Sequence, residues 1–309
     1  MTVRAPGKAM LCGEYAVLEG APAVVAAVDR YARARFAQHG QTSPSPFVRE
    51  ATRRAAEHVA RTGKRAPTAT PIVDSDGFRG PGGIKYGLGS SAAATVAAAA
   101  AVFDAAGLDV GAAEVRKSLH RLCAQAHQSA QEGSGSGADV AASIFGGILR
   151  FEHAADGPRT EPLALPAGLH LAFVWTGRAA STALLLERTR GAVRFGRMPD
   201  ISATFASAFA DGDARAVVET ARLYGTAMRK LGDDCGVAIV THEHALYMEL
   251  ARRHGGAAKP SGAGGGDISV AFLLDHDQAK ALHAAAAHAG LHPLHLALDR
   301  EGVKSESAS

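Results

Sequence analysis

Glycine-rich segments at three places along this chain constrain its fold more than any other feature of the sequence. They cover residues 5–15, 85–93 and 259–267. Glycine makes up 35 of the 309 residues, about 11% against about 7% in an average protein. Because glycine allows tight turns and close approach of the backbone to a ligand, this placement predicts loops at defined points between regular elements.

The middle segment has a direct physical interpretation. Its sequence Gly87-Leu88-Gly89-Ser90-Ser91-Ala92 opens an alanine-rich stretch that predicts a helix over 91–106. Backbone N–H groups and the positive end of the helix dipole bind phosphate at such a point. We expect Ser90 or Ser91 to cap the helix, and their hydroxyls to face a magnesium ion held by a nucleotide. A tight turn and a capped helix without any ligand is the alternative that this segment alone leaves open.

Two other phosphate-binding motifs are disfavoured. The GxxxxGK[ST] pattern of P-loop NTPases occurs nowhere in the sequence. The dinucleotide fingerprint GxGxxA matches residues 87–92 and 133–138, but no convincing apolar strand precedes either stretch, as a Rossmann fold requires. A Rossmann enzyme is therefore a weak alternative.

Charge and cysteine usage exclude several classes of protein. Lys and Arg number 33 and Asp and Glu number 30, which argues against a general nucleic-acid or acidic-membrane binder. No apolar run is long enough to span a bilayer, and the N-terminus carries no apolar targeting segment. Cys12, Cys123 and Cys235 form no CxxC pair, which favours reduced thiols in a cytoplasmic protein. The histidine spacings contain no zinc motif, so a structural metal is not expected.

Apolar periodicity predicts a mixture of strands and helices without strict βαβ alternation, and therefore an α+β fold. The expected strands are 3–5, 9–12, 23–28, 31–36, 148–152, 169–175, 268–274 and 293–298. The expected helices are 47–61, 91–106, 112–131, a short one from 138, 180–193, 202–210, 214–231, 243–253 and 278–289. We expect two domains, 1–160 and 161–309, and a frayed polar tail over 303–309.

Taken together, the three glycine-rich segments resemble the three motifs of the GHMP kinases, the superfamily of galactokinase, homoserine kinase, mevalonate kinase and phosphomevalonate kinase. Residues 5–8 (APGK) with 13–17 (GEYAV) look like motif one, 87–93 (GLGSSAA) like the phosphate loop, and 261–266 (SGAGGG) like motif three. The resemblance implies an N-terminal domain like ribosomal protein S5 and a C-terminal ferredoxin-like α/β sandwich, with the active site between them.

Finer signatures resemble the phosphomevalonate kinase branch. Residues 126–131 and 135–142 are similar to its segment around the catalytic aspartate, and 175–177 (WTG) with 180–182 (AST) to another of its segments. Lys85 and Asp267 also fit this branch. The resemblance implies ATP-dependent phosphorylation of mevalonate 5-phosphate to mevalonate 5-diphosphate, a step of isoprenoid biosynthesis. Mevalonate kinase, another small-alcohol kinase of the superfamily, and a non-catalytic relative that binds a nucleotide or metabolite remain alternatives.

The resemblance also implies roles for individual residues. Asp139 would lie near the acceptor hydroxyl and accept its proton, while Lys8 would neutralise charge on the transferring phosphoryl group. The residues expected at the ATP phosphates are Gly87, Leu88, Gly89, Ser90, Ser91 and Ala92. Those expected at the substrate are Glu14, Tyr15, Lys85, Ser136, Gly137, Arg178, Ser181, Thr182, Ser261, Gly262, Ala263 and Gly264. The partners are ATP and the small substrate, and the protein is expected to be a monomer or a homodimer.

The magnesium site is expected to depend on Ser91. Related mevalonate kinases use a glutamate about eleven residues before the aspartate, and Gln128 holds that spacing here. A one-residue gap would place His127 there instead, and Glu132 is the nearest carboxylate. The resemblance therefore implies that Mg²⁺ rests mainly on Ser91 and on the nucleotide phosphates.

Overall fold

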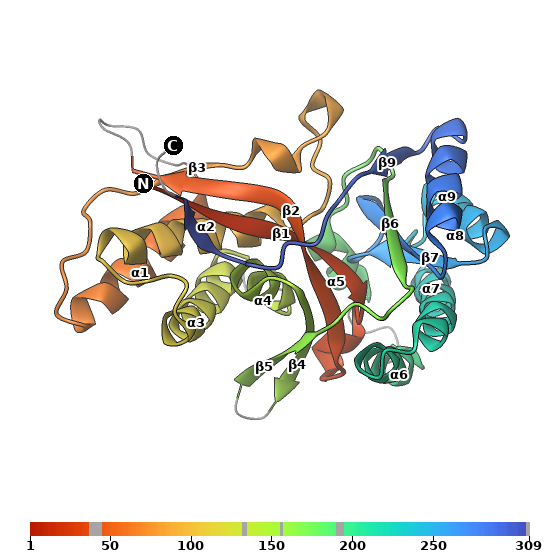
Figure 1. Cartoon of the computed structure of the whole chain (residues 1–309), viewed down its shortest axis with the longest axis horizontal. Coiled ribbons are helices and arrows are strands. Elements are labelled where there is room, and N and C mark those ends of the chain that lie inside the picture. The colour runs from red at the N-terminus through yellow and green to blue at the C-terminus, as the bar shows by residue number, and fades with distance from the viewer. Residues whose placement is uncertain (37–44, 132–134, 155–156, 190–194, 307–309) are drawn as a thin grey trace.

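Two antiparallel sheets with helices packed against them make up the part of the chain that the computed structural model describes, residues 1–36, 45–131, 135–154, 157–189 and 195–306 (Figure 1). Every neighbouring pair of strands in these residues is antiparallel. Helices do not alternate with parallel strands, so the predicted α+β class is confirmed.

The first sheet has the strand order β10-β1-β2-β4-β5, and β3 also pairs with β2. Its strands are β1 (Thr2–Cys12), β2 (Ala23–Arg35), β3 (Ile72–Asp74), β4 (Ile148–Ala154), β5 (Gly157–Leu163) and β10 (Lys304–Glu306). The sequence predicted two short strands, 3–5 and 9–12, where the structure has β1, and two more, 23–28 and 31–36, where it has β2. Both β1 and β2 are continuous strands. The register shifts between Pro6 and Gly7 and again between Met10 and Cys12, so bulges absorb the residues that we expected to break the strand.

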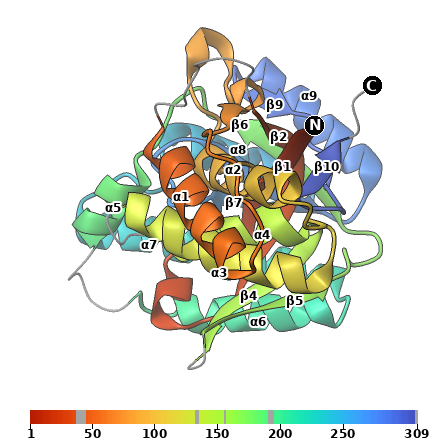
Figure 2. The same ribbon diagram turned by 90° about the vertical axis from the view of Figure 1, so that its left-hand side faces the viewer.

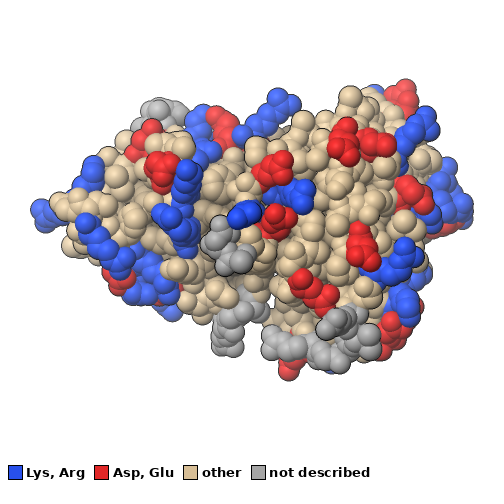
Figure 3. Space-filling model, turned by 90° about the horizontal axis from the view of Figure 1, so that it is seen from below, with Lys and Arg blue, Asp and Glu red and all other residues tan. Residues whose placement is uncertain are grey.

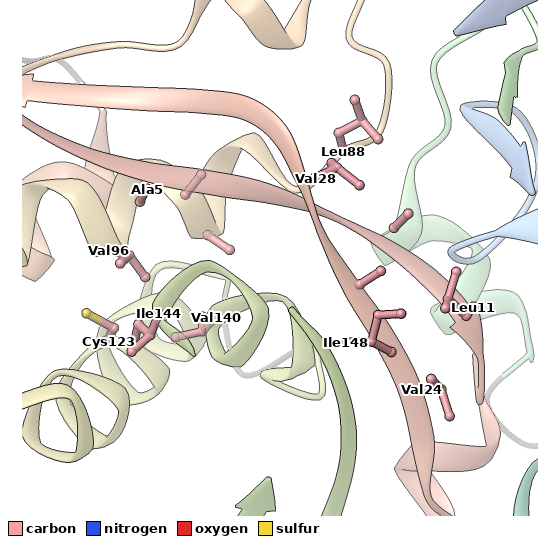
Figure 4. Packing of buried hydrophobic residues seen from close by; sticks show 14 of the residues in the cluster. Ala5, Leu11, Val24, Val28, Leu88, Val96, Cys123, Val140, Ile144 and Ile148 are labelled. Atoms are coloured by element: carbon pink, nitrogen blue, oxygen red, sulfur yellow. The ribbon is translucent and has the colours of Figure 1, made fainter. Parts of the chain in front are cut away.

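Four helices cover one face of this sheet (Figure 2): α1 (Pro46–Arg61), α2 (Ser90–Ala105), α3 (Ala113–Ala130) and α4 (Ala138–Phe145). All residues of α2 from Ala92 to Phe103 are buried, because α2 lies between the sheet and α1 and α3. Its small alanine side chains allow close packing on every side. Figure 4 shows Val96 of α2 and Val140 and Ile144 of α4 close together beneath Ala5 of β1.

The second sheet has the order β7-β8-β6-β9. Its strands are β6 (His170–Trp175), β7 (Ala257–Ser261), β8 (Ile268–Leu273) and β9 (His292–Leu294). The helices of this half are α5 (Thr182–Thr189), α6 (Met198–Ala210), α7 (Ala214–Cys235), α8 (His242–Arg253) and α9 (His276–His288). Of these, α7 and α8 contact β7, α9 contacts β6, and α6 packs on α7.

The last residues of the chain return to the first sheet. Strand β10 pairs with β1, with Thr2 opposite Glu306, and Val303 before it is fully buried. The prediction of a frayed tail is therefore wrong for residues 303–306, while 307–309 lie outside the described residues. The proposed division after residue 160 falls within β5, and β10 belongs to the sheet of the first half.

Charges of both signs occur across the face of the molecule shown in Figure 3. This distribution agrees with the near-balance of basic and acidic residues in the sequence. Among the described residues, no helix is both long and apolar enough to cross a membrane.

Candidate active site

A cavity of about 270 Å³ lies where the three glycine-rich segments meet, between the first sheet and the loops of the second half. The residues predicted for the site that line it are Lys8, Glu14, Tyr15, Lys85, Gly87, Gly89, Ser90, Ser91, Ser136, Asp139, Thr182, Gly262 and Ala263. These residues come from segments more than 250 positions apart in the sequence. The structure therefore brings all three motifs to one place.

The phosphate loop is held against β1 by the backbone. The Lys8 N–H donates to the Leu88 carbonyl over 2.9 Å. Glycine is required beside this bond, because a Cβ at Gly7 would lie 2.7 Å from the same carbonyl oxygen. Gly89 is the N-cap of α2 in a left-handed conformation, and the cap has no side-chain hydrogen bond. The prediction that Ser90 or Ser91 caps the helix is therefore wrong, and both side chains line the cavity instead.

Lys8 and Asp139 both lie beside Gly89 of the phosphate loop. A Cβ at Gly89 would be 3.0 Å from Lys8 Cγ and 3.8 Å from Asp139 Cβ. Asp139 is in the first turn of α4, whose N-cap is Gly137, so it does not serve as the N-cap of that helix. Its Oδ1 accepts a hydrogen bond from the Val140 N–H over 2.9 Å. The two predicted catalytic side chains thus face the cavity beside the N-termini of two helices, where anions are stabilised.

His127, which the sequence offered only as an alternative to Gln128, is a residue of the site. It is buried in the last turn of α3, and its Nε2 lies 3.0 Å from Ser91 Oγ and 4.0 Å from Asp139 Oδ2. Gln128, which has the spacing of the magnesium glutamate, is exposed and lines a different cavity. The two neighbours differ in where their side chains point from α3, toward the site for His127 and away from it for Gln128. Sequence spacing does not reveal this difference. Glu132 lies outside the described residues.

Asp267 joins motif three to residues 176–180, which precede α5. Its Oδ1 accepts from the Ala180 N–H over 3.0 Å, and its carbonyl accepts from the Thr176 N–H over 2.9 Å. Burial raises the pKa of its carboxyl group, and the Ala180 hydrogen bond and the charges of Lys8 and Lys85 partly offset that effect. The sequence singled out Asp267 only as a mark of its branch, but the structure places it in the cavity wall.

A buried ion pair connects motif one to β7. Lys259 is fully buried, and its Nζ donates to Oε1 of Glu14, which is 4% exposed. The same carboxylate oxygen accepts from the Gly262 N–H over 3.1 Å, and the Tyr15 hydroxyl donates to the Ala263 carbonyl over 2.6 Å. These bonds fix the motif-three loop against motif one. Lys259 was not predicted to belong to the site, because an isolated lysine in a sequence is normally a surface residue.

Several predicted residues do not line the cavity. Leu88 and Ala92 are buried in the core, and Ser261 is buried in β7. Arg178 is largely exposed and lies 3.8 Å from Glu243. The others that lie outside the lining are Gly137, Ser181 and Gly264.

The donor set in the cavity fits a magnesium ion shared with a nucleotide. The described residues contain no group of three or more His, Cys, Asp or Glu side chains placed to hold a metal. Mg²⁺ bound to nucleotides commonly takes one or two protein oxygens, with phosphates and water completing the shell. The Ser91 hydroxyl and the Asp139 carboxylate, which line one cavity, are oxygen ligands of this kind.

Comparisons with known proteins agree with this geometry. The family model for the GHMP kinases N terminal domain matches residues 51–147. A phosphomevalonate kinase of Streptomyces sp. (strain CL190) is 30% identical, with 97% of each chain covered. A mevalonate kinase of Methanothermobacter thermautotrophicus is 29% identical over 86% of this chain and 88% of its own.

Solved structures show the same fold. A Lin0012 protein from Listeria innocua has a TM-score of 0.86 at 25% identity, with 98% of each chain covered. Streptococcus pneumoniae phosphomevalonate kinase in complex with phosphomevalonate and AMPPNP has a TM-score of 0.83 at 20% identity, over 96% of this chain and 99% of that one. Together these matches confirm the family resemblance and the two-domain fold that the three motifs predicted.

Proposed function

The chain belongs to the GHMP kinase family, and from this premise we propose that it transfers the γ-phosphoryl group of ATP to mevalonate 5-phosphate, forming mevalonate 5-diphosphate and ADP. That it is a kinase of this family follows from the comparisons, whereas the acceptor is our proposal. The observation that carries it is the 30% identity to a phosphomevalonate kinase over nearly the whole of both chains.

The charges around the cavity support a substrate with several negative groups. Lys8 and Lys85 line the cavity, and the N-termini of α2 and α4 open onto it. Mevalonate 5-phosphate carries a phosphate and a carboxylate, each of which a lysine stabilises. The Glu14 carboxylate adds little repulsion, because Lys259 pairs with it. We assign the nucleotide phosphates to the loop at Gly89 and the acceptor to the side of Lys85.

The reaction forms a bond between an acceptor oxygen and Pγ and breaks the bond between Pγ and the bridging oxygen that leaves with ADP. Lys8 would stabilise charge on the transferring group. A phosphate monoester loses its second proton at about pH 6, so the acceptor oxygen is largely deprotonated at neutral pH. Asp139 would then accept a proton only from acceptor molecules whose phosphate still carries a single negative charge. Mg²⁺, held by Ser91 and the nucleotide, would neutralise charge on the phosphates.

Mevalonate kinase remains the second candidate, since the relative that is 29% identical has that activity. A coupled assay of ADP release with mevalonate 5-phosphate, mevalonate, homoserine and galactose separates the candidates. We expect turnover with mevalonate 5-phosphate alone. Turnover of mevalonate but not of its phosphate would refute the proposed acceptor, and ATP binding without ADP release would favour a non-catalytic relative. Lys8→Ala protein, purified in the same way, controls for contaminating kinases, because Lys8 lines the cavity and is assigned to stabilise the transferring group.

A further inference from the structure

His127 connects two of the groups that face the cavity. Its Nε2 lies 3.0 Å from Ser91 Oγ in the first turn of α2 and 4.0 Å from Asp139 Oδ2 in the first turn of α4. The imidazole itself is buried and does not line the cavity. Its position behind both groups indicates that it acts through them and not on the substrate.

The ring of His127 is held in place by the surrounding helices. Its carbonyl accepts the Gln131 N–H over 3.0 Å at the end of α3. Phe47, in the first turn of α1, packs against the ring with a centroid distance of 5.2 Å. Because the backbone of α3 fixes the Cα of His127 and Phe47 packs against its ring, Nε2 presents a fixed hydrogen-bonding point to Ser91.

Such a fixed point has a chemical consequence for the serine. An isolated serine hydroxyl rotates among three staggered positions, and a hydrogen bond to a fixed partner selects one of them. A hydroxyl has one donor and two acceptor lone pairs. Whether Ser91 donates to Nε2 or accepts from it, Oγ therefore keeps at least one lone pair for a metal ion or a phosphate oxygen.

We propose that His127 is a positioning residue that holds the Ser91 hydroxyl in the orientation needed to bind Mg²⁺ together with the nucleotide phosphates. The proposal rests on the proposed place of the nucleotide at the phosphate loop, and not on the identity of the acceptor. Groups that orient a metal ligand typically contribute 10–100-fold to metal affinity or activity. Removal of the imidazole should therefore weaken the metal-dependent part of nucleotide binding.

Calorimetric titration with ADP, in saturating Mg²⁺ and separately in EDTA, tests this without any acceptor. We expect His127→Ala to weaken ADP binding about 10–100-fold in Mg²⁺ and less than about twofold in EDTA. His127→Gln, whose amide nitrogen reaches the position of Nε2, should recover most of the Mg²⁺-dependent affinity. Equal weakening in Mg²⁺ and in EDTA, or no recovery with glutamine, would overturn the proposal.

A double-mutant cycle tests whether His127 acts through Ser91. If it does, adding His127→Ala to Ser91→Ala should change ADP affinity in Mg²⁺ by less than about twofold, and fully additive losses would contradict the proposal. His120→Ala is the matched control, because His120 is a second buried histidine of α3 and lies against Phe145 with a centroid distance of 5.3 Å. His120→Ala should leave the Mg²⁺ dependence of ADP binding unchanged. If it weakened ADP binding in Mg²⁺ as much as His127→Ala does, the effect would be a structural disturbance of α3.

The binding experiment contains no acceptor, so its outcome does not depend on whether mevalonate 5-phosphate or mevalonate is phosphorylated. A wrong acceptor would appear in the ADP-release assay and leave these affinities unchanged. Nucleotide binding by the wild-type protein that is independent of Mg²⁺ would refute the role of His127 directly.

Discussion

The buried pair of Lys259 and Glu14 offers a sharp test of how the two halves of the site are held together. Lys259 Nζ donates to Glu14 Oε1 and, over 2.7 Å, to the Pro260 carbonyl. In Lys259→Met the carboxylate would stay buried with the Gly262 N–H as the remaining donor that the structure shows for it. The substitution keeps the length of the side chain and removes its charge.

The expected loss is large because the charge left behind belongs to a carboxylate that is only 4% exposed. Removing one partner of a buried ion pair costs about 3–5 kcal/mol. The unfolding entropy of a chain of this length makes 1 kcal/mol equivalent to about 1.5 °C in Tm. We therefore expect Lys259→Met to lower the free energy of unfolding by about 3–5 kcal/mol and Tm by about 5–8 °C.

Urea denaturation and scanning calorimetry measure both quantities. The double variant Lys259→Met with Glu14→Gln should recover much of the loss, because it leaves no uncompensated charge. Lys230→Met is the matched control, since Lys230 pairs with Asp234 at the surface and its loss should leave the free energy of unfolding nearly unchanged. A loss below about 1 kcal/mol for Lys259→Met, or a double variant less stable than the single one, would refute the reasoning.

Three further predictions concern the phosphate loop, the chemistry and the pH dependence of folding. Gly87→Ala should lower the free energy of unfolding by at least about 1–2 kcal/mol in urea and weaken ATP binding, because its φ is +85° and a Cβ would lie 2.3 Å from Asp267 Cβ. Gly83→Ala, at φ +73° with nothing within 4 Å, is its control, and equal losses would contradict the close approach. Asp139→Asn should lower kcat at least about a hundredfold below pH 6, and the loss should narrow above pH 6 if the acceptor is a phosphate; a loss constant over pH would indicate an alcohol acceptor. Burial lowers the pKa of His244 from 6.5 to about 4, so the unfolded state binds more protons between these values and stability falls by about 3 kcal/mol as pH drops through them. We therefore expect the difference in unfolding free energy between wild type and His244→Gln to shrink by about 3 kcal/mol between pH 7 and pH 4. Denaturation at both pH values measures it, and a difference that stays constant would contradict the prediction.

The site could be predicted from the sequence where it is built from local motifs. The glycines and serines of the phosphate loop have a direct physical explanation, whereas Lys8 and Asp139 followed from the family resemblance. The structure places Lys8 and Asp139 at one cavity with Gly87, Gly89, Ser90 and Ser91 of the loop. Lys259 and Glu14 were not paired in advance, because 245 positions separate them and nothing local marks either as buried. His127 was left as an alternative to Gln128, because sequence spacing does not show which of two adjacent helix residues, about 100° apart around the axis, points toward the site.

The fold was predictable to a similar degree. The alanine-rich helix α2 was located to within one residue, since a glycine-serine segment opens it. Strand β5 was missed because its sequence contains Pro158 and Pro162, which are tolerated there since β5 is an edge strand. Strand β10 was missed because three polar residues gain their strand conformation from pairing with β1 at the other end of the chain.

The identity of the acceptor is the central claim, and ³¹P NMR of the reaction products tests it most directly. The protein is incubated with Mg²⁺, ATP and either mevalonate 5-phosphate or mevalonate, and the new phosphorus signals are assigned. The proposed function predicts the coupled pair of signals of a diphosphate monoester from mevalonate 5-phosphate, and no product from mevalonate. A phosphomonoester signal formed from mevalonate, with mevalonate 5-phosphate left unchanged, would contradict it.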